Sequence, residues 1–218
     1  MIRIDENKLV SAFASVLLFR SDDETRAHMC NLFVRVHGKQ LSVVATDGRA
    51  LALWEDAIEN LDGVDEALLV DAGDASAVVK DIRRIRGTAR GEATLSLAAE
   101  SVVLSTKKHL HLRVVPGLTF PAYEQVLPKA RDRAPAAVLG LTSALIGRID
   151  RAFGGGLVVW EPTGGEASPI LISAYESANP LRVVVMPATG PVAKLPVTSS
   201  QKANGTGRAK APTEDVHP

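Results

Sequence analysis

The chain has 218 residues, and its 25 basic and 25 acidic side chains give a net formal charge of zero. This balance excludes a uniformly basic, histone-like nucleic-acid binder but allows local basic faces. The lone cysteine, Cys30, cannot form an intramolecular disulfide, which favours a reducing compartment. No apolar run is long enough for a transmembrane helix, and the N-terminal MIRIDENK lacks the apolar core of a signal peptide. These features predict a cytoplasmic protein without a membrane segment.

Apolar residues alternate over short runs and recur at helical spacing between them, which predicts a β-α-β-β-β unit repeated about every 60 residues. The first unit has a strand over residues 1–4, a helix over 6–18 and strands over 31–36, 40–45 and 50–55. The second has a strand over 66–70, a helix over 72–86 and strands over 93–97, 101–105 and 109–114. The third has a strand over 136–141, a helix over 142–153 and strands over 157–160, 169–173 and 181–186.

Repeated units of this kind bury one sheet face beneath their helices, so neighbouring units pair and share a core. We therefore expect an α+β fold with the helices on one side of antiparallel sheets, which form one long outer layer. A polar link over residues 129–135 precedes the third unit. Beyond Gly190 the composition shifts to Lys, Pro, Ser, Thr, Gly and Asn, so residues 190–218 are predicted to be a disordered tail.

Three separate stretches carry a recognisable pattern. Residues 41–53 read LSVVATDGRALAL, in which Asp-Gly between two apolar runs predicts a hairpin turn. Residues 120–128 read FPAYEQVLP, and residues 181–187 read LRVVVMP. In this order the three stretches resemble the bacterial DNA polymerase sliding clamp, the beta subunit of the replicative polymerase, DNA polymerase III. That family carries a VATDGHRLA-like segment, then FPDYxxVLP, then a C-terminal VVMP-like strand.

The resemblance implies a domain organisation. Residues 1–128 resemble the complete middle domain of the family, built from two units, and residues 136–189 resemble the second half of its last domain. Residues 129–135 are then a linker and residues 190–218 a tail. Family chains have three full domains, and two chains close a ring of twelve units. Since this chain has three units, a ring would need four chains, so the resemblance implies a homo-oligomer.

We find no catalytic constellation in the sequence. His109 and His111 lie on one strand face without a third ligand, so a solvated strand face is favoured over a metal pair. The triple glycine 154–156 follows a helix rather than opening one, which is typical of a helix stop and not of a phosphate-binding loop. We expect a protein that is not an enzyme and that needs no metal or cofactor.

Two predicted helices carry basic residues opposite their apolar stripes. Family clamps line their channel with such helices, which bind the phosphates of double-stranded DNA without reading bases. The residues expected to contact DNA are Lys80, Arg83, Arg84, Arg86, Arg148 and Arg151. The alternative is that basic residues near a helix C-terminus merely complement the helix dipole, as in any protein.

The resemblance also implies a pocket that accepts short peptides from polymerases or the clamp loader. The matching positions are Met29, Thr46, Gly48, Leu51, Pro121, Val126, Val184, Met186 and Pro187. Apolar side chains, adaptable methionines and a glycine that allows close backbone approach suit a groove. Alternatively, these are ordinary core and strand-end residues. Arg49-Ala50 stands where the family has His-Arg, which predicts altered peptide affinity or specificity.

The favoured function is a sliding-clamp-like processivity factor for DNA replication, which binds DNA non-specifically and tethers partners through the pocket. A first alternative is an adaptor that forms no ring, of phage or mobile-element origin, binding clamp-interacting peptides or a host clamp. A second alternative is an enzyme on an unrelated α/β fold.

Overall fold

A computed structural model describes the chain over residues 1–85, 92–97, 101–105, 109–128, 141–163, 168–175 and 179–186. The predicted linker, the predicted tail and all but the last residue of the predicted strand 136–141 lie outside these residues. Within them, no helix is long and apolar enough to cross a membrane.

The predicted helices and strands that fall within the described residues are present, with bounds that shift by at most two residues. The helices are α1 (Glu6–Val16), α2 (Ala72–Ile85) and α3 (Ser143–Phe153), with 3-10 turns η1 (Leu17–Phe19), η2 (Glu24–Met29) and η3 (Tyr123–Gln125). The strands are β1 (Ile2–Asp5), β2 (Leu32–His37), β3 (Gln40–Thr46), β4 (Ala50–Ala57), β5 (Glu59–Asn60), β6 (Glu66–Val70), β7 (Glu92–Leu97), β8 (Ser101–Ser105), β9 (His109–Arg113), β10 (Val158–Pro162), β11 (Ile170–Ala174) and β12 (Leu181–Val185). The sequence analysis predicted neither β5 nor the 3-10 turns.

Polar side chains set the helix ends. Asp5 caps α1, because its Oδ1 accepts hydrogen bonds from the amides of Asn7 and Lys8 at 2.7 and 3.2 Å. Asp71 Oδ1 accepts from the Asp74 amide at 2.9 Å in the first turn of α2. α3 begins after Thr142, whose side chain accepts from the Leu145 amide, and ends at Gly154 in the left-handed conformation.

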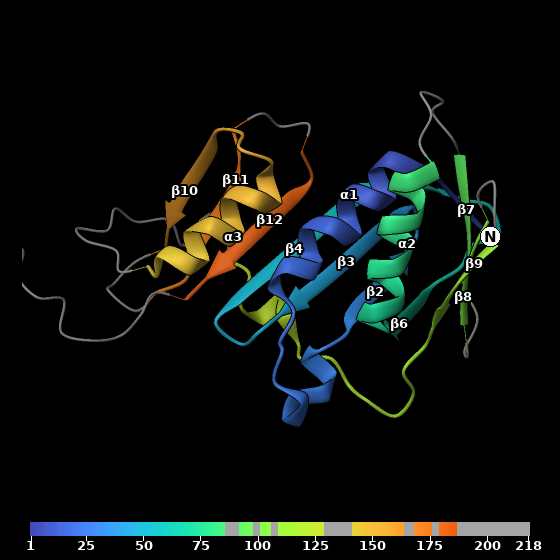
Figure 1. Cartoon of the computed structure of the whole chain (residues 1–218), viewed down its shortest axis with the longest axis horizontal. Coiled ribbons are helices and arrows are strands. Elements are labelled where there is room, and N and C mark those ends of the chain that lie inside the picture. The colour runs from blue at the N-terminus through green and yellow to red at the C-terminus, as the bar shows by residue number, and fades with distance from the viewer. Residues whose placement is uncertain are drawn as a thin grey trace, which may run out of the picture.

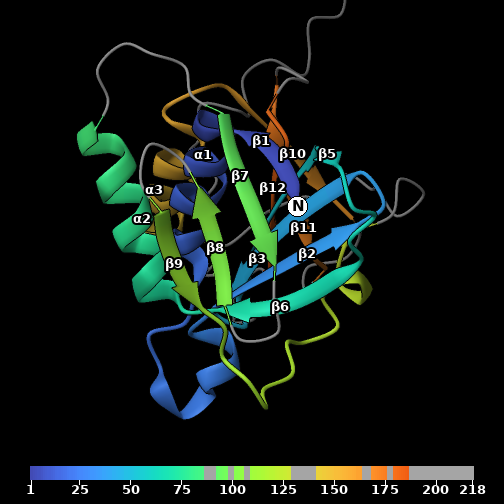
Figure 2. The same ribbon diagram turned by 90° about the vertical axis from the view of Figure 1, so that its right-hand side faces the viewer.

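The strands form two antiparallel sheets rather than the expected single layer. One has seven strands in the order β10-β11-β12-β4-β3-β2-β6, and the other has five in the order β5-β1-β7-β8-β9. The first two units exchange their first strands: β1 pairs with β7, and β6 pairs with β2. Figure 1 shows the five-stranded sheet edge-on beside α2, and Figure 2 shows it face-on.

The third unit continues the first. Its last strand, β12, pairs with β4, the last strand of the first unit, so the seven-stranded sheet runs through both. The three helices lie on one side of this sheet in the spatial order α3, α1, α2 (Figure 1). They cover a core that includes Phe13, Phe19, Trp54, Ile149 and Phe153. The prediction of helices packed on one side of antiparallel strands is therefore confirmed for this sheet.

Candidate functional site

The three recognisable stretches meet on the sheet. β3 and β4 form the hairpin around the Thr-Asp-Gly turn, and β12 pairs with β4 so that Val184 lies opposite Leu51. Past the end of the strand, the Met186 amide donates a hydrogen bond to the Arg49 carbonyl at 2.9 Å. The folded chain thus brings together segments more than 130 residues apart, as the resemblance implied.

A second apolar cluster covers the face of the seven-stranded sheet away from the helices. We call it the outer-face cluster, and it consists of Val44, Leu51, Leu53, Leu69, Phe120, Tyr123 and Val184. Phe33 packs against it and stacks on Phe120 with ring centroids 5.1 Å apart. The segment after β9 therefore crosses this face and is anchored there by aromatic side chains.

The predicted pocket residues fall into two groups by exposure. Leu51 and Val184 are only 5% and 3% exposed, so in a groove they would form the floor rather than the contact surface. Val126 and Met186 are both 44% exposed, so in a groove they would form the rim. Pro121 is half-buried, and Pro187 lies outside the described residues.

The aromatic residues of this face were missed as candidate site residues. Phe120 and Tyr123 belong to the FPAYEQVLP stretch, but only its Pro121 and Val126 were selected from the sequence. Side chains alternate along β2: Leu32 and Val34 face the helices, and Phe33 between them faces the other side. Strand alternation was thus a signal that Phe33 lies on the outer face.

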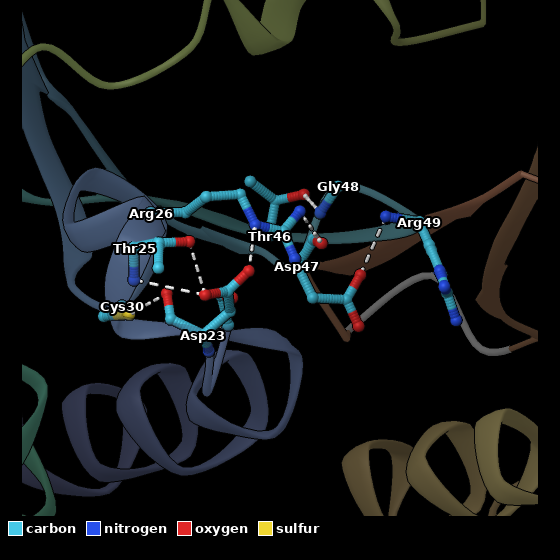
Figure 3. A network of polar contacts seen from close by, with 9 residues as sticks. Asp23, Thr25, Arg26, Cys30, Thr46, Asp47, Gly48 and Arg49 are labelled. Carbon is cyan, nitrogen blue, oxygen red and sulfur yellow. Dashed lines mark hydrogen bonds and ion pairs between the residues drawn. The ribbon is translucent and has the colours of Figure 1, made fainter.

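The turn at residues 46–50 is fixed by its own side chains (Figure 3). Thr46 Oγ1 donates to the Ala50 carbonyl at 2.8 Å and accepts from the Gly48 amide at 3.0 Å. Asp47 Oδ1 accepts from the amides of Arg49 and Ala50, each at 2.8 Å. Gly48 has a φ of +85°, a conformation that favours glycine. Thr46 is only 7% exposed, and its hydroxyl is used by the turn itself. Its role here is therefore structural.

The 3-10 turn η2 holds Met29 beside this hairpin turn. Arg26 donates to the Asp47 carbonyl from Nη1 at 3.3 Å and to Asp23 from Nε at 3.0 Å (Figure 3). A Cβ atom placed on Gly48 would lie 3.2 Å from Arg26 Nη1 and 3.8 Å from Met29 Sδ. Glycine therefore permits the close approach of η2, and Met29 is half-buried at that contact.

Arg148 does not project outward as the sequence predicted. Its Nη1 lies 2.6 Å from Asp47 Oδ2, and its guanidinium lies over the Phe19 ring at 4.7 Å from the centroid. Only 23% of the Arg148 side chain and 19% of the Asp47 side chain are exposed. The ion pair ties α3 of the third unit to the hairpin of the first, so Arg148 joins two units and its charge is paired with Asp47.

This ion pair also sets the acidity of Asp47. Burial raises the pKa of its carboxyl, but the hydrogen bonds from Arg148, Ala50 and Arg49 outweigh burial and hold the pKa below its ordinary value. The other two guanidinium nitrogens of Arg148, Nε and Nη2, are buried without a hydrogen-bond partner among the described residues. Loss of Asp47 would thus leave a largely buried cation unpaired.

We expect the substitution Asp47→Asn to lower the free energy of unfolding at pH 7 by about 1–3 kcal/mol, because it removes the charge but keeps the acceptor for the turn amides. A carboxyl with a lowered pKa contributes stability above its unfolded pKa, near ~3.9, and loses it as the pH falls through the folded pKa. The difference between wild type and variant should therefore be constant from neutral pH down to about 5 and shrink below about 4. Urea denaturation across this range measures it.

The control for this substitution is Asp150→Asn, which removes an exposed carboxylate from α3, the helix that carries Arg148. It should change the free energy of unfolding by less than about 0.5 kcal/mol. Equal stability of wild type and Asp47→Asn at pH 7 would show that the ion pair does not hold the third unit in place.

The other predicted basic residues are open to solvent. Lys80, Arg83 and Arg84 on α2 are exposed and pair with no acidic side chain in the described part of the chain. Arg151 on α3 is exposed too, and its Nε donates to the Gly147 carbonyl of its own helix at 3.1 Å. Arg86 lies outside the described residues.

Basic residues from α2 and α3 converge over α1. Arg83 and Arg151 line one shallow cavity of about 380 Å³ whose floor is the surface of α1. That surface carries the small residues Ser11, Ala14 and Ser15. A bulky ligand can therefore approach α1 with a cation on each side. We call this surface, with Lys80 and Arg84, the basic helix face.

A neighbouring cavity holds basic residues that the sequence analysis did not select. It measures about 460 Å³, and its charged lining consists of Arg20, Arg26, Arg49, Arg148 and Arg151 together with Asp22, Asp23 and Asp47. Arg20 pairs with Asp22 and Arg26 with Asp23, whereas the exposed Arg49 side chain has no partner in the described part of the chain. Arg49 was noted only as a departure from a family motif, and nothing in its local sequence marks it as part of a basic cavity.

No family model and no curated protein matches the sequence. The structure is similar to the DNA polymerase sliding clamp from Bacillus subtilis, at 12% identity and a TM-score of 0.70, covering 87% of this chain and 64% of that one. It is also similar to the DNA polymerase III beta subunit from Thermotoga maritima, at 18% identity and a TM-score of 0.69, covering 86% and 65%. A Pseudomonas aeruginosa sliding clamp bound to griselimycin matches at 16% identity and a TM-score of 0.69, covering 86% and 65%.

These likenesses show the fold. The chain has the fold of the bacterial sliding clamp and spans under two thirds of the length of these clamp chains. The resemblance seen in the three short stretches is therefore confirmed by a comparison that does not depend on them. At this level of identity the similarity extends to the fold alone. DNA binding, peptide binding and assembly of this chain are matters for proposal.

Proposed function

We propose that this protein is a non-enzymatic, clamp-like accessory protein of DNA replication. It binds double-stranded DNA without reading its sequence through the basic helix face, and it tethers polymerase or clamp-loader peptides at the outer-face cluster. The proposed organisation is a complete clamp-like domain over residues 1–128 followed by half a domain over 136–189. A ring of the family's twelve units would take four such chains.

The observation that carries the proposal is the separation of two surfaces on opposite faces of one sheet. The helix side presents Lys80, Arg83, Arg84 and Arg151, which are exposed and which no carboxylate neutralises in the described part of the chain. The other side presents a cluster of buried apolar residues, with Val126 and Met186 exposed near it. Both DNA and a peptide could therefore be bound at once, as tethering requires.

The basic helix face suits a duplex backbone better than a base-reading site. Its cations lie on two separate helices, α2 and α3, which flank α1 rather than project a single recognition helix. Charges arranged in this way neutralise phosphates but bring no hydrogen-bonding side chain into a groove. Binding of this kind is independent of sequence and permits sliding.

We expect labelled duplex DNA to bind in a salt-dependent way that is the same for unrelated sequences. If about four phosphates are neutralised per chain, log K should fall against log salt with a slope of roughly −3 to −4. Fluorescence anisotropy with two duplexes of equal length and different sequence measures both properties. Binding that differs strongly between the duplexes, or that salt leaves unchanged, would rule out the sliding role.

The adaptor that forms no ring is the second candidate function. It predicts peptide binding at the outer-face cluster without DNA affinity. The DNA titration above therefore distinguishes the two functions.

A further inference from the structure

The third unit has an open side that the first two units close against each other. In each unit the three strands after the helix are consecutive in the chain and form a triplet. β2 is the first strand of the first unit's triplet, and β6 of the second unit pairs with its outer edge. β7, which opens the second triplet, has β1 of the first unit on its outer edge. β10 opens the third triplet, and no strand of the described part of the chain pairs with its outer edge.

The exposure of the helix-facing side chains differs between these three strands in the same way. The helix-facing residues of β2 are closed off, with Leu32, Val34 and Val36 between 0% and 2% exposed. Of those of β7, Ala93 and Leu95 are both 0% exposed, and only Leu97 at the end of the strand is partly exposed. The corresponding residues of β10 remain partly exposed, although they pack against the same core, and these residues are Val158 and Trp160.

The helix of the third unit is also covered less than the helices of the first two units. α1 and α2 pack on one another, and α3 packs on α1 with only one of its flanks. Arg148 marks that flank, because it reaches Phe19 and Asp47. Ile146, two residues earlier, points roughly 200° away around the helix and therefore lies on the flank beside β10. The Ile146 side chain is 48% exposed.

We infer that this side of the third unit, which we call the open face, is covered by the third unit of a second copy of the chain. The open face is defined by Ile146, Val158 and Trp160. In the two other units the equivalent surface is covered by a unit of the same fold, and within the described chain those units are already paired with each other. A second copy supplies the missing unit in identical form, and a two-fold axis makes the contact reciprocal.

The composition of the chain favours this occupant. The net formal charge of zero gives no long-range repulsion between two copies. The open face is apolar, and an exposed apolar surface of this kind marks an interaction site. Two chains joined in this way would contain six units, with a composite domain in the middle made of one unit from each chain.

The experiment measures mass in solution with the protein alone, so its outcome does not depend on DNA or peptide binding. The variant Ile146→Lys places a charge in the open face, and Leu61→Lys is its matched control, since Leu61 is also 48% exposed but lies beyond β5 on the first unit. Sedimentation or light scattering from nanomolar to high micromolar concentration should give an even number of chains for the wild type and for Leu61→Lys. Ile146→Lys should contain half that number.

Tryptophan emission gives a second, local measurement. Trp54 is 2% exposed and should report no change, whereas Trp160 lies in the open face. Dilution of the wild type should shift the emission to longer wavelength, towards that of Ile146→Lys, with circular dichroism confirming that the variant is folded. A wild type that is monomeric at every concentration, or an Ile146→Lys variant that keeps the wild-type mass, would overturn the inference.

Discussion

Replacing Lys80, Arg83, Arg84 and Arg151 together by alanine is expected to weaken duplex-DNA binding by roughly 100- to 1,000-fold at low salt. Each of these side chains is exposed, and no carboxylate in the described part of the chain pairs with it, so each can release about one counterion from a phosphate. The slope of log K against log salt should therefore fall towards zero, by roughly 3 to 4. Anisotropy titrations of a labelled duplex at several salt concentrations measure both quantities.

The control removes positive charge from the opposite side of the sheet. Arg35 and Arg182 share the outer face with Phe33 and Val184, because residues two apart on a strand point the same way. The double variant Arg35→Ala/Arg182→Ala changes the net charge by the same two units as Arg83→Ala/Arg84→Ala. DNA affinity should fall strongly for the second pair and little for the first. Equal losses would mean that only total charge matters, and that the helices do not form the interface.

Arg148 is left out of this set on structural grounds. The sequence places it on the same helix as Arg151, and helical spacing alone makes both look solvent-facing. Its partners, Phe19 and Asp47, are far away in the chain, and nothing near residue 148 indicates them. Alanine at this position would test the joint between units and confuse a DNA measurement with a loss of stability.

Local structure was predictable because local chemistry determines it. The period of apolar residues predicted all three helices, and Asp5, Thr142 and Gly154 predicted where two of them begin or end. The strands of each triplet follow from alternation, since their neighbours in the sheet are their neighbours in the chain.

Pairings between distant segments could not be predicted in the same way. The exchange of first strands places Ile4 opposite Ala93, and no turn or loop length connects these residues. Which strands share a sheet depends on pairings between distant segments of this kind, so the expected single layer was wrong for a non-local reason. The pairing of β4 with β12 is equally distant, but there the family resemblance supplied what periodicity lacks.

The candidate peptide site shows both outcomes. Resemblance selected Leu51 and Val184, and the structure pairs them, but it also buries them. Burial depends on Phe120 and Tyr123, which a segment after the second unit carries across the sheet. A sequence motif identifies residues that lie in the same part of the fold. Which of them form the buried floor of a groove and which form its exposed rim depends on how the segments pack.

That division determines how the peptide site should be tested. A charge at Leu51 would enter a cluster that is almost fully buried and would destabilise the fold by several kcal/mol. Val126 and Met186 are each 44% exposed and tolerate a polar residue. We therefore expect the double substitution Val126→Lys/Met186→Lys to weaken peptide binding more than about 100-fold while leaving the thermal midpoint nearly unchanged.

The physical reason is the loss of apolar contact at the rim. An apolar peptide that inserts leucine or phenylalanine side chains gains on the order of 1–3 kcal/mol per anchor, and a lysine ammonium at the same place must be desolvated or displaced. The wild-type affinity should be modest, roughly micromolar, because the free peptide loses conformational entropy on binding. Fluorescence anisotropy of a labelled QLxLF-type peptide measures both affinities.

Leu61→Lys is the control for this experiment also, since Leu61 is 48% exposed and lies away from the outer-face cluster. It should bind the peptide as tightly as the wild type. DNA affinity of the double variant should be unchanged or slightly higher, because its added lysines lie on the face away from the helices. A wild type that binds no peptide up to millimolar concentration, or a folded double variant that binds as well as the wild type, would remove the outer-face cluster as the tethering site. The basic helix face would then be the only surface left to support a role in replication.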